Sequence, residues 1–206
     1  MKQIKRKLLT ALFTFISLFS VLTLSTSASS THTVVKGDTM WKIAVTYQVG
    51  LDEIKSSNPH IKNPNLIYPG DIINIPSANA SAREYEREVV RLVNEERRKN
   101  GLREFEEDWQ ISRVARYKSE DMQTNNYFSH TSPTYGSPFQ MLKDFGISYR
   151  SAGENIARGQ KTPSEVVNAW MNSSGHRANI LNPSYTHIGV GFADKGKYWT
   201  QMFIYK

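Results

Sequence analysis

The first 28 residues and the absence of cysteine together set the strongest constraint on how this chain can fold. The chain begins with a basic segment, continues with an apolar run over residues 8–24 and then turns to small polar residues. This order is typical of a secretory signal peptide, so we expect residues 1–28 to be removed. An uncleaved membrane anchor is the alternative, because the apolar run nearly reaches spanning length. An exported chain without cysteine must be stabilised by its packed cores, without disulfides.

The charge that remains after cleavage argues against a nucleic-acid ligand. Loss of residues 1–28 removes four basic and no acidic side chains and lowers the formal charge from +7 to +3. The remaining chain has no long tract of Lys or Arg, which is the feature that attracts nucleic acids. The lack of cysteine also excludes a thiolate metal site. We therefore expect a secreted, Gram-positive protein that binds no nucleic acid and keeps no stable membrane span after cleavage.

Residues 29–76 form a first structural unit with a strand at each end. Alternating residues predict strands at 32–35 and 72–75, and two short helical patterns lie between them. Thr39 or Asp38 is placed to cap the first helix. The segment before the last strand contains Pro69 and Gly70, which are typical of a tight turn.

This unit resembles a lysin motif (LysM) domain over essentially its whole length. The stretches VVKGDTMWKIA and IYPGDIINIP, with Asn58 between them, occur in the family's order and spacing. The resemblance implies a strand-helix-helix-strand module that binds glycans containing N-acetylglucosamine, such as peptidoglycan or chitin. It also implies a groove between two loops. The groove residues so implied are Gly37, Asp38, Thr39, Met40 and Trp41 on one side and Leu66, Ile67, Tyr68 and Pro69 on the other.

A structural role is the alternative for several of these residues. A shallow groove with exposed amides and an apolar wall suits an acetamido group. In so small a domain, however, Trp41 and Ile67 could be core residues instead. Gly37 and Gly70 could likewise serve only backbone geometry.

A short polar segment joins this unit to a larger second domain. Residues 77–83 are small and polar and predict a linker, which leaves residues 84–206 for the second domain. Apolar residues recur at helical spacing from Tyr85 and again from Ile111. Each pattern predicts a helix with one buried face.

The second half of this domain predicts one more helix and a hairpin. Thr162, Pro163 and Glu165 form a capping box with proline at the first helical position. The segment HIGVGFADKGKYWTQMFIYK predicts two alternating strands joined near residues 195–196. We therefore expect helices around a mainly antiparallel sheet, and an α+β fold for the whole chain.

The second domain resembles the CAP superfamily of cysteine-rich secretory, antigen 5 and pathogenesis-related proteins. The stretches NEERRKNGL, YFSHTSP, GENIA, AWMNSSGHRANIL, IGVG and YWTQMF occur in the family's order, and the bacterial SCP-like branch is the nearer match. The resemblance covers residues 84–206. It implies a CAP-type α-β-α sandwich with a central cavity.

The resemblance also implies which residues line that cavity. The family commonly carries two His and two Glu there, sometimes with zinc or another divalent ion. His130, Glu154 and His176 match three of these positions, whereas the fourth falls near Ser173 and has no glutamate. The remaining candidates to line the pocket are Glu165, Asn172 and Gln201.

The sequence supports one leading hypothesis and two alternatives. In the leading hypothesis LysM binds peptidoglycan or a chitin-like glycan at the cell wall or spore surface. The CAP domain is then a binding or regulatory module without catalysis, with a protein partner in the wall or spore coat. It requires no cofactor, and His130, Glu154 and His176 form a hydrogen-bonded cluster.

The first alternative is a metal-dependent hydrolase of a wall polymer or peptide. A weakly held ion such as zinc, bound by His130, His176 and Glu154, would activate water there. The second alternative is a lipid-binding module, which rests on fold analogy.

Overall fold

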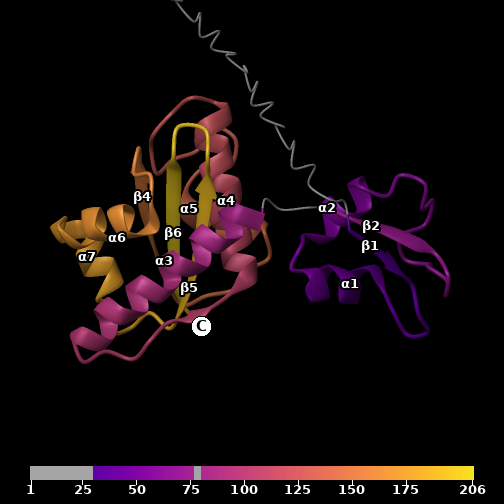
Figure 1. Cartoon of the computed structure of the whole chain (residues 1–206), viewed down its shortest axis with the longest axis horizontal. Helices are drawn as coiled ribbons and strands as arrows, with labels where there is room; N and C mark the ends of the chain where they lie inside the picture. The colour runs from indigo at the N-terminus through magenta and orange to yellow at the C-terminus, as the bar shows by residue number, and fades with distance from the viewer. Residues whose placement is uncertain (1–29, 77–79) are drawn as a thin grey trace, which may run out of the picture.

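The structure is a computed structural model that describes residues 30–76 and 80–206. The predicted signal peptide at residues 1–28, and its alternative as a membrane anchor, lie outside the described residues. Within the described ranges, no helix combines the length and the apolar character needed to cross a bilayer. Figure 1 shows a small first domain beside a larger second one.

The first domain has the strand-helix-helix-strand order that the sequence predicts. β1 (Ser30–Thr33) pairs antiparallel with β2 (Ile72–Ile75), and α1 (Met40–Tyr47) and α2 (Leu51–Ser56) lie between them in the chain. β1 lies two residues earlier than predicted, because Asp38 accepts a hydrogen bond from the Val35 amide at 2.9 Å and starts a turn. The α1 cap is Thr39, which accepts from the Lys42 amide at 3.1 Å. The core consists of Val34, Met40, Ile43, Ala44, Val49, Ile54, Ile73 and Ile75.

The connection between the domains is shorter than the predicted linker of residues 77–83. α3 (Ala80–Lys99) begins inside that segment. Ala82 is buried in the core of the second domain. Arg83 donates hydrogen bonds to the carbonyl oxygens of Tyr47 and Gln48 at 3.4 and 3.2 Å. This part of the segment is helical because it packs against both domains.

The second domain contains a four-stranded sheet in the order β3-β5-β6-β4. β5 pairs antiparallel with β6, β6 pairs antiparallel with β4, and the short β3 runs parallel to β5. The mainly antiparallel sheet is therefore as predicted. The elements after α3 are β3 (Glu106–Glu107), α4 (Trp109–Thr124), α5 (Pro138–Asp144), β4 (Ser151–Arg158), α6 (Pro163–Met171), α7 (Ser174–Ile180), β5 (His187–Ala193) and β6 (Tyr198–Tyr205).

Helices cover both faces of this sheet and make it the middle layer of an α-β-α sandwich. Val190 and Phe203 pack with α3 and α6 on one face, whereas Met202 and Ile204 pack with α4 and α5 on the other. The final hairpin is consequently buried almost throughout. The two predicted strands are present, and neither face of the hairpin meets solvent.

Two glycines let α4 lie directly on β5. A Cβ atom at Gly189 would lie 2.2 Å from the backbone nitrogen of Ser112, and one at Gly191 would lie 2.1 Å from the carbonyl carbon of Ala115. Ser119 adds a hydrogen bond from its hydroxyl to the Gly191 carbonyl at 3.0 Å. The stretch IGVG therefore supplies the close helix-to-sheet contact of this fold.

The outer side of α4 contacts the first domain. Arg113 Nε donates to Glu53 Oε1 at 2.7 Å, and both side chains are mostly buried. A Cβ atom at Gly50 would lie 2.3 Å from the Arg113 guanidinium. The backbone of the first domain thus packs directly on this side chain.

Replacement of Gly191 by alanine tests the close contact. The new methyl group meets the α4 backbone, which cannot move away as a flexible side chain would, so we expect the free energy of unfolding to fall by about 3 kcal/mol. Gly175→Ala is the control, because a Cβ atom there meets no atom within 4 Å. In a helix that change stabilises by less than about 1 kcal/mol. Equal effects of the two changes in chemical denaturation would contradict the proposed packing.

Candidate functional site

His130 and Glu154, two residues expected to line the CAP cavity, form a hydrogen-bonded pair. The two side chains meet at 2.7 Å between Nδ1 and Oε1. Glu154 comes from β4 and its side chain is only 2% exposed, whereas His130 comes from the loop after α4 and is 56% exposed. Burial raises the pKa of Glu154. The hydrogen bond to Glu154 raises the pKa of His130. The result is a buried carboxylate that is covered by an exposed imidazole.

A buried lysine on α4 supplies a positive charge to the same site. Lys118 is fully buried and donates to the Tyr127 hydroxyl at 3.0 Å and to the Ser129 carbonyl at 2.8 Å. Burial lowers the pKa of Lys118, and Glu154 counteracts this effect. Sequence reasoning missed Lys118. Its position four residues after Val114, on the apolar face of the helix, was the available signal.

Asp121 holds the loop that carries His130. Its carboxylate accepts from Asn125 Nδ2, Ser132 Oγ and Thr134 Oγ1, each at 2.6 Å, and also from the Tyr127 hydroxyl. Burial acts to raise the pKa of Asp121, but these four donors outweigh it and lower that pKa. Sequence reasoning also missed Asp121. It lies three residues after Lys118 on the same helix face.

Gln201 belongs to a second polar cluster, on the opposite face of β4. Side chains alternate along a strand, so Glu154 and Asn155 point to opposite faces. Asn155 lies opposite Gln201 in the sheet and donates to its Oε1 at 3.1 Å. Asn155 also donates to the His176 carbonyl at 3.1 Å and accepts from Asn179 at 2.8 Å. This cluster ties α7 to the sheet through the backbone of His176.

A groove lies in the first domain between the two loops that carry the predicted glycan-binding residues. It has a volume of about 250 Å³. Trp41 and Leu66 at the groove are 50% and 53% exposed, so Trp41 is not a core residue. Ile67 is partly buried and packs against the core. The predicted residues that line the groove are Asp38, Thr39, Met40, Trp41, Leu66 and Ile67, and Leu51, Lys55, Pro64 and Asn65 join them.

The other predicted groove residues lie beside the groove and shape its loops. Gly37 has a φ of +96°, which permits the turn before α1. Its carbonyl accepts from Lys42 Nζ at 2.7 Å. Tyr68 is 57% exposed and its amide donates to Asp71 at 2.8 Å. Tyr68 and Pro69 thus belong to the loop that leads into β2.

Comparison with known proteins identifies both domains. The family model described as the cysteine-rich secretory protein family, CAP, matches residues 90–204, which is more than half of the chain. The chain belongs to the CAP family. The LysM domain model matches residues 32–76. Both resemblances are therefore confirmed.

The chain is similar to several proteins from Bacillus species. YkwD of Bacillus subtilis (strain 168) is 62% identical over 130 residues, which are 63% of this chain and 51% of YkwD. The spore coat assembly protein ExsA of Bacillus cereus is 52% identical over 46 residues, 22% of this chain and 7% of ExsA. A solved extracellular protein with an SCP domain from Bacillus anthracis has a TM-score of 0.59 and 34% identity, covering 67% of this chain and 47% of that one. The chain thus spans about half the length of YkwD.

The metal ion expected at the CAP site stays a prediction. Glu154 and His130 bond to each other, and burial, with His130 as a second cause, lowers the pKa of His176. In the part of the chain that the structure describes, no three His, Asp or Glu side chains gather as a possible metal site. Asn172 is the exposed C-cap residue of α6, and Glu165 accepts from the Lys161 amide at the other end of that helix. Of the three residues of the predicted cluster, His130 and Glu154 are hydrogen-bonded to each other, whereas His176 joins the Asn155 cluster through its backbone carbonyl.

Replacement of Asp121 by asparagine tests the support of the His130 loop. The loss of a charged acceptor should lower the free energy of unfolding by about 2 kcal/mol at neutral pH. Because folding lowers the pKa of Asp121 below its ordinary value of 3.8, this contribution is present above that value and is lost as the pH falls through the folded pKa. The gap between wild type and variant should therefore close in acid.

Chemical denaturation from about pH 7 to about pH 2 measures this gap. Asp144→Asn is the control, because Asp144 is exposed and, among the described residues, accepts only from Gln140. It should change the stability by less than about 0.5 kcal/mol. A gap for Asp121→Asn that stays constant over the whole pH range would show that its charge is not the cause.

Proposed function

We propose that this protein is held at the bacterial cell wall or spore surface by its LysM domain, which binds peptidoglycan or another glycan rich in N-acetylglucosamine. The CAP domain then acts as a binding or regulatory module at that surface. The observation that carries the proposal is the groove in the LysM domain. Two half-exposed apolar side chains, Trp41 and Leu66, lie at this groove.

The composition of the groove suits an acetylated amino sugar. An apolar side chain such as Trp41 offers a surface to the sugar ring and to the acetamido methyl group. Thr39 and Asn65 bring polar groups to the same groove. The LysM segment carries four Lys and four acidic residues and is therefore neutral overall. A neutral module is appropriate for a largely uncharged glycan backbone.

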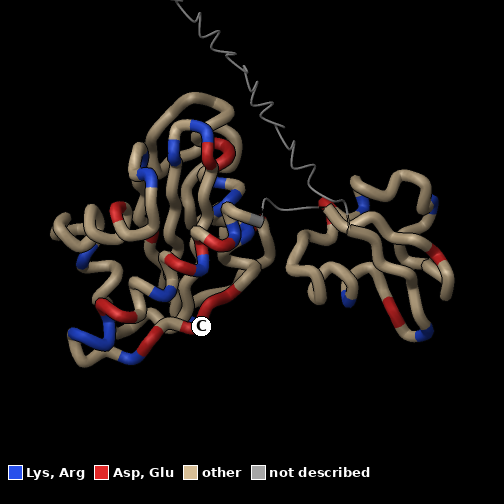
Figure 2. Tube along the Cα trace, viewed as in Figure 1, with Lys and Arg blue, Asp and Glu red and all other residues tan. Residues whose placement is uncertain are grey.

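The CAP domain offers a binding surface more readily than a hydrolytic centre. His130 is exposed, but its Nδ1 is engaged by Glu154. Lys118 is already bonded to Tyr127 and Ser129. Acidic and basic residues are interspersed along the trace of this domain (Figure 2). Such a mixture of charges suits a protein or wall-polymer partner.

The comparisons support an extracellular location. The solved relative from Bacillus anthracis is an extracellular protein, and the LysM segment is similar to part of a spore coat assembly protein. A signal peptide at residues 1–28 would export the chain to such a location. The spore coat is therefore one candidate site of attachment, and the vegetative wall is the other.

Replacement of Trp41 by alanine tests the groove. We expect the affinity for a soluble N-acetylglucosamine oligomer, measured by calorimetry, to fall at least about tenfold, or about 1.4 kcal/mol. Sedimentation with purified peptidoglycan should weaken in parallel. Ile72→Ala is the control, because Ile72 is also about half exposed but lies on β2 outside the groove. Equal binding by wild type and Trp41→Ala would refute the assignment of the groove.

A further inference from the structure

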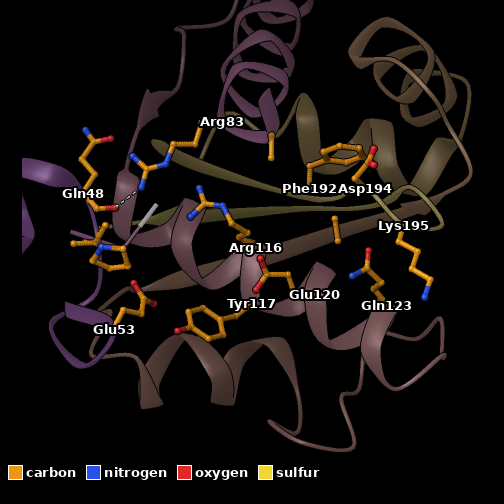
Figure 3. Close-up of a pocket in the computed structure, with 14 residues that line it drawn as sticks. Gln48, Glu53, Arg83, Arg116, Tyr117, Glu120, Gln123, Phe192, Asp194 and Lys195 are labelled. Carbon is orange, nitrogen blue, oxygen red and sulfur yellow. Dashed lines mark hydrogen bonds between the residues drawn. The ribbon is translucent and has the colours of Figure 1, made fainter. Parts of the chain in front are cut away.

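A second and larger cleft lies between the two domains (Figure 3). Its volume is about 570 Å³, which is within the range of sites that hold small ligands. Glu53 comes from the LysM domain, Arg83 from α3 and Glu120 from α4, and Lys195 comes from the turn between β5 and β6. The cleft exists only because the domains pack against each other.

This cleft is separate from the glycan groove. Leu51 and Lys55 of α2 line the groove, whereas Glu53 of the same helix lines the cleft. Residues four apart share one side of a helix, and a residue two positions away points to the opposite side. A glycan in the groove therefore leaves the cleft free for another ligand.

Several charged groups of the cleft are already paired and form its walls. Arg116 donates to both oxygens of Glu86 at 2.9 and 2.6 Å. Glu53 is paired with Arg113. These pairs hold α3, α4 and α2 in place and are not available to a ligand.

Other groups of the cleft remain available. Arg83 Nε and Gln123 Oε1 are buried without a hydrogen-bond partner among the described residues. Glu120 and Lys195 likewise have no ion-pair partner in the described ranges. The cleft therefore combines two acceptors, Glu120 and Gln123, with two donors, the Nε of Arg83 and the amine of Lys195. The two terminal nitrogens of Arg83 already donate to Tyr47 and Gln48. Arg83 Nε and Gln123 Oε1 are buried, and such polar atoms cost free energy unless something satisfies them. Glu120 and Lys195 are exposed at the cleft and can reach a ligand from its rim.

We propose that the interdomain cleft binds a short peptide that carries both ammonium and carboxylate groups, the chemistry of a peptidoglycan stem peptide. This inference rests on the proposed attachment to the wall. Glu120 and Gln123 lie one turn apart on α4 and receive the ammonium group. The Nε of Arg83 and the amine of Lys195 receive carboxylates. The LysM groove would hold the glycan strand while the cleft binds the attached peptide.

Calorimetry with a defined peptide tests the proposal. The probe is the tripeptide L-Ala-γ-D-Glu-meso-diaminopimelic acid, titrated into the full chain without residues 1–28. We expect binding in the range of about 10 μM to about 1 mM. Glu120→Gln and Lys195→Ala should each weaken it at least about fivefold, and acetylation of the side-chain amine of the peptide should do the same. Thermal melts verify that the variants are folded.

Two matched controls change the same residue types outside the cleft. Glu84→Gln and Lys143→Ala alter exposed residues that do not line it and should leave peptide affinity unchanged. No peptide binding by the wild type, or binding that Glu120→Gln and Lys195→Ala do not affect, overturns the proposal.

A parallel titration with an N-acetylglucosamine oligomer separates the two hypotheses. Binding of the oligomer without the peptide refutes the cleft and leaves the wall-attachment proposal standing. Binding of the peptide without the oligomer refutes the glycan groove instead, and the cleft proposal survives as a peptide site.

Discussion

The close contact between α4 and β5 is the interaction on which the rest of this structure depends. Gly189 and Gly191 remove the side chains that would otherwise hold the helix away from the sheet. The helix backbone can then approach the strand directly, and hydroxyl groups such as that of Ser119 bridge the two. The position of every other side chain on α4 follows from this contact. Interdigitating large side chains would place the helix farther out.

Because α4 is fixed, it serves two sites at once. Arg113 faces the LysM domain and pairs with Glu53. Lys118 and Asp121 face the loop that carries His130, and together they hold its backbone and side chains. The candidate CAP site and the interdomain cleft are therefore coupled to the same rigid helix. A change that shifts α4 affects both.

Local sequence patterns predicted the four elements of the LysM domain, the helices α3, α4 and α6 and the final hairpin, and also caps such as Thr39. They did not predict β3, α5, β4 or α7. They could not predict features that arise between distant segments. Glu154 and Gln201 were both expected to line one cavity. Gln201 of β6 lies opposite Asn155 of β4, however, and the side chain of Glu154 points to the other face of the sheet. Lys118 is a charged residue at a buried position of α4. A pattern of apolar residues does not predict a buried lysine. The contact between Glu53 and Arg113 joins two domains. Each domain is recognised by motifs of its own, so no single motif indicates a contact between the two.

The central claim is that α4 holds the LysM domain in a fixed orientation against the CAP domain. Residual dipolar couplings of backbone amides in the intact protein measure this orientation most directly. We predict that one alignment tensor fits both domains of the wild type, and that Arg113→Ala gives the LysM domain a separate and weaker tensor. Two independent tensors in the wild type would contradict the account, because the domains would then move independently and the cleft between them would not persist.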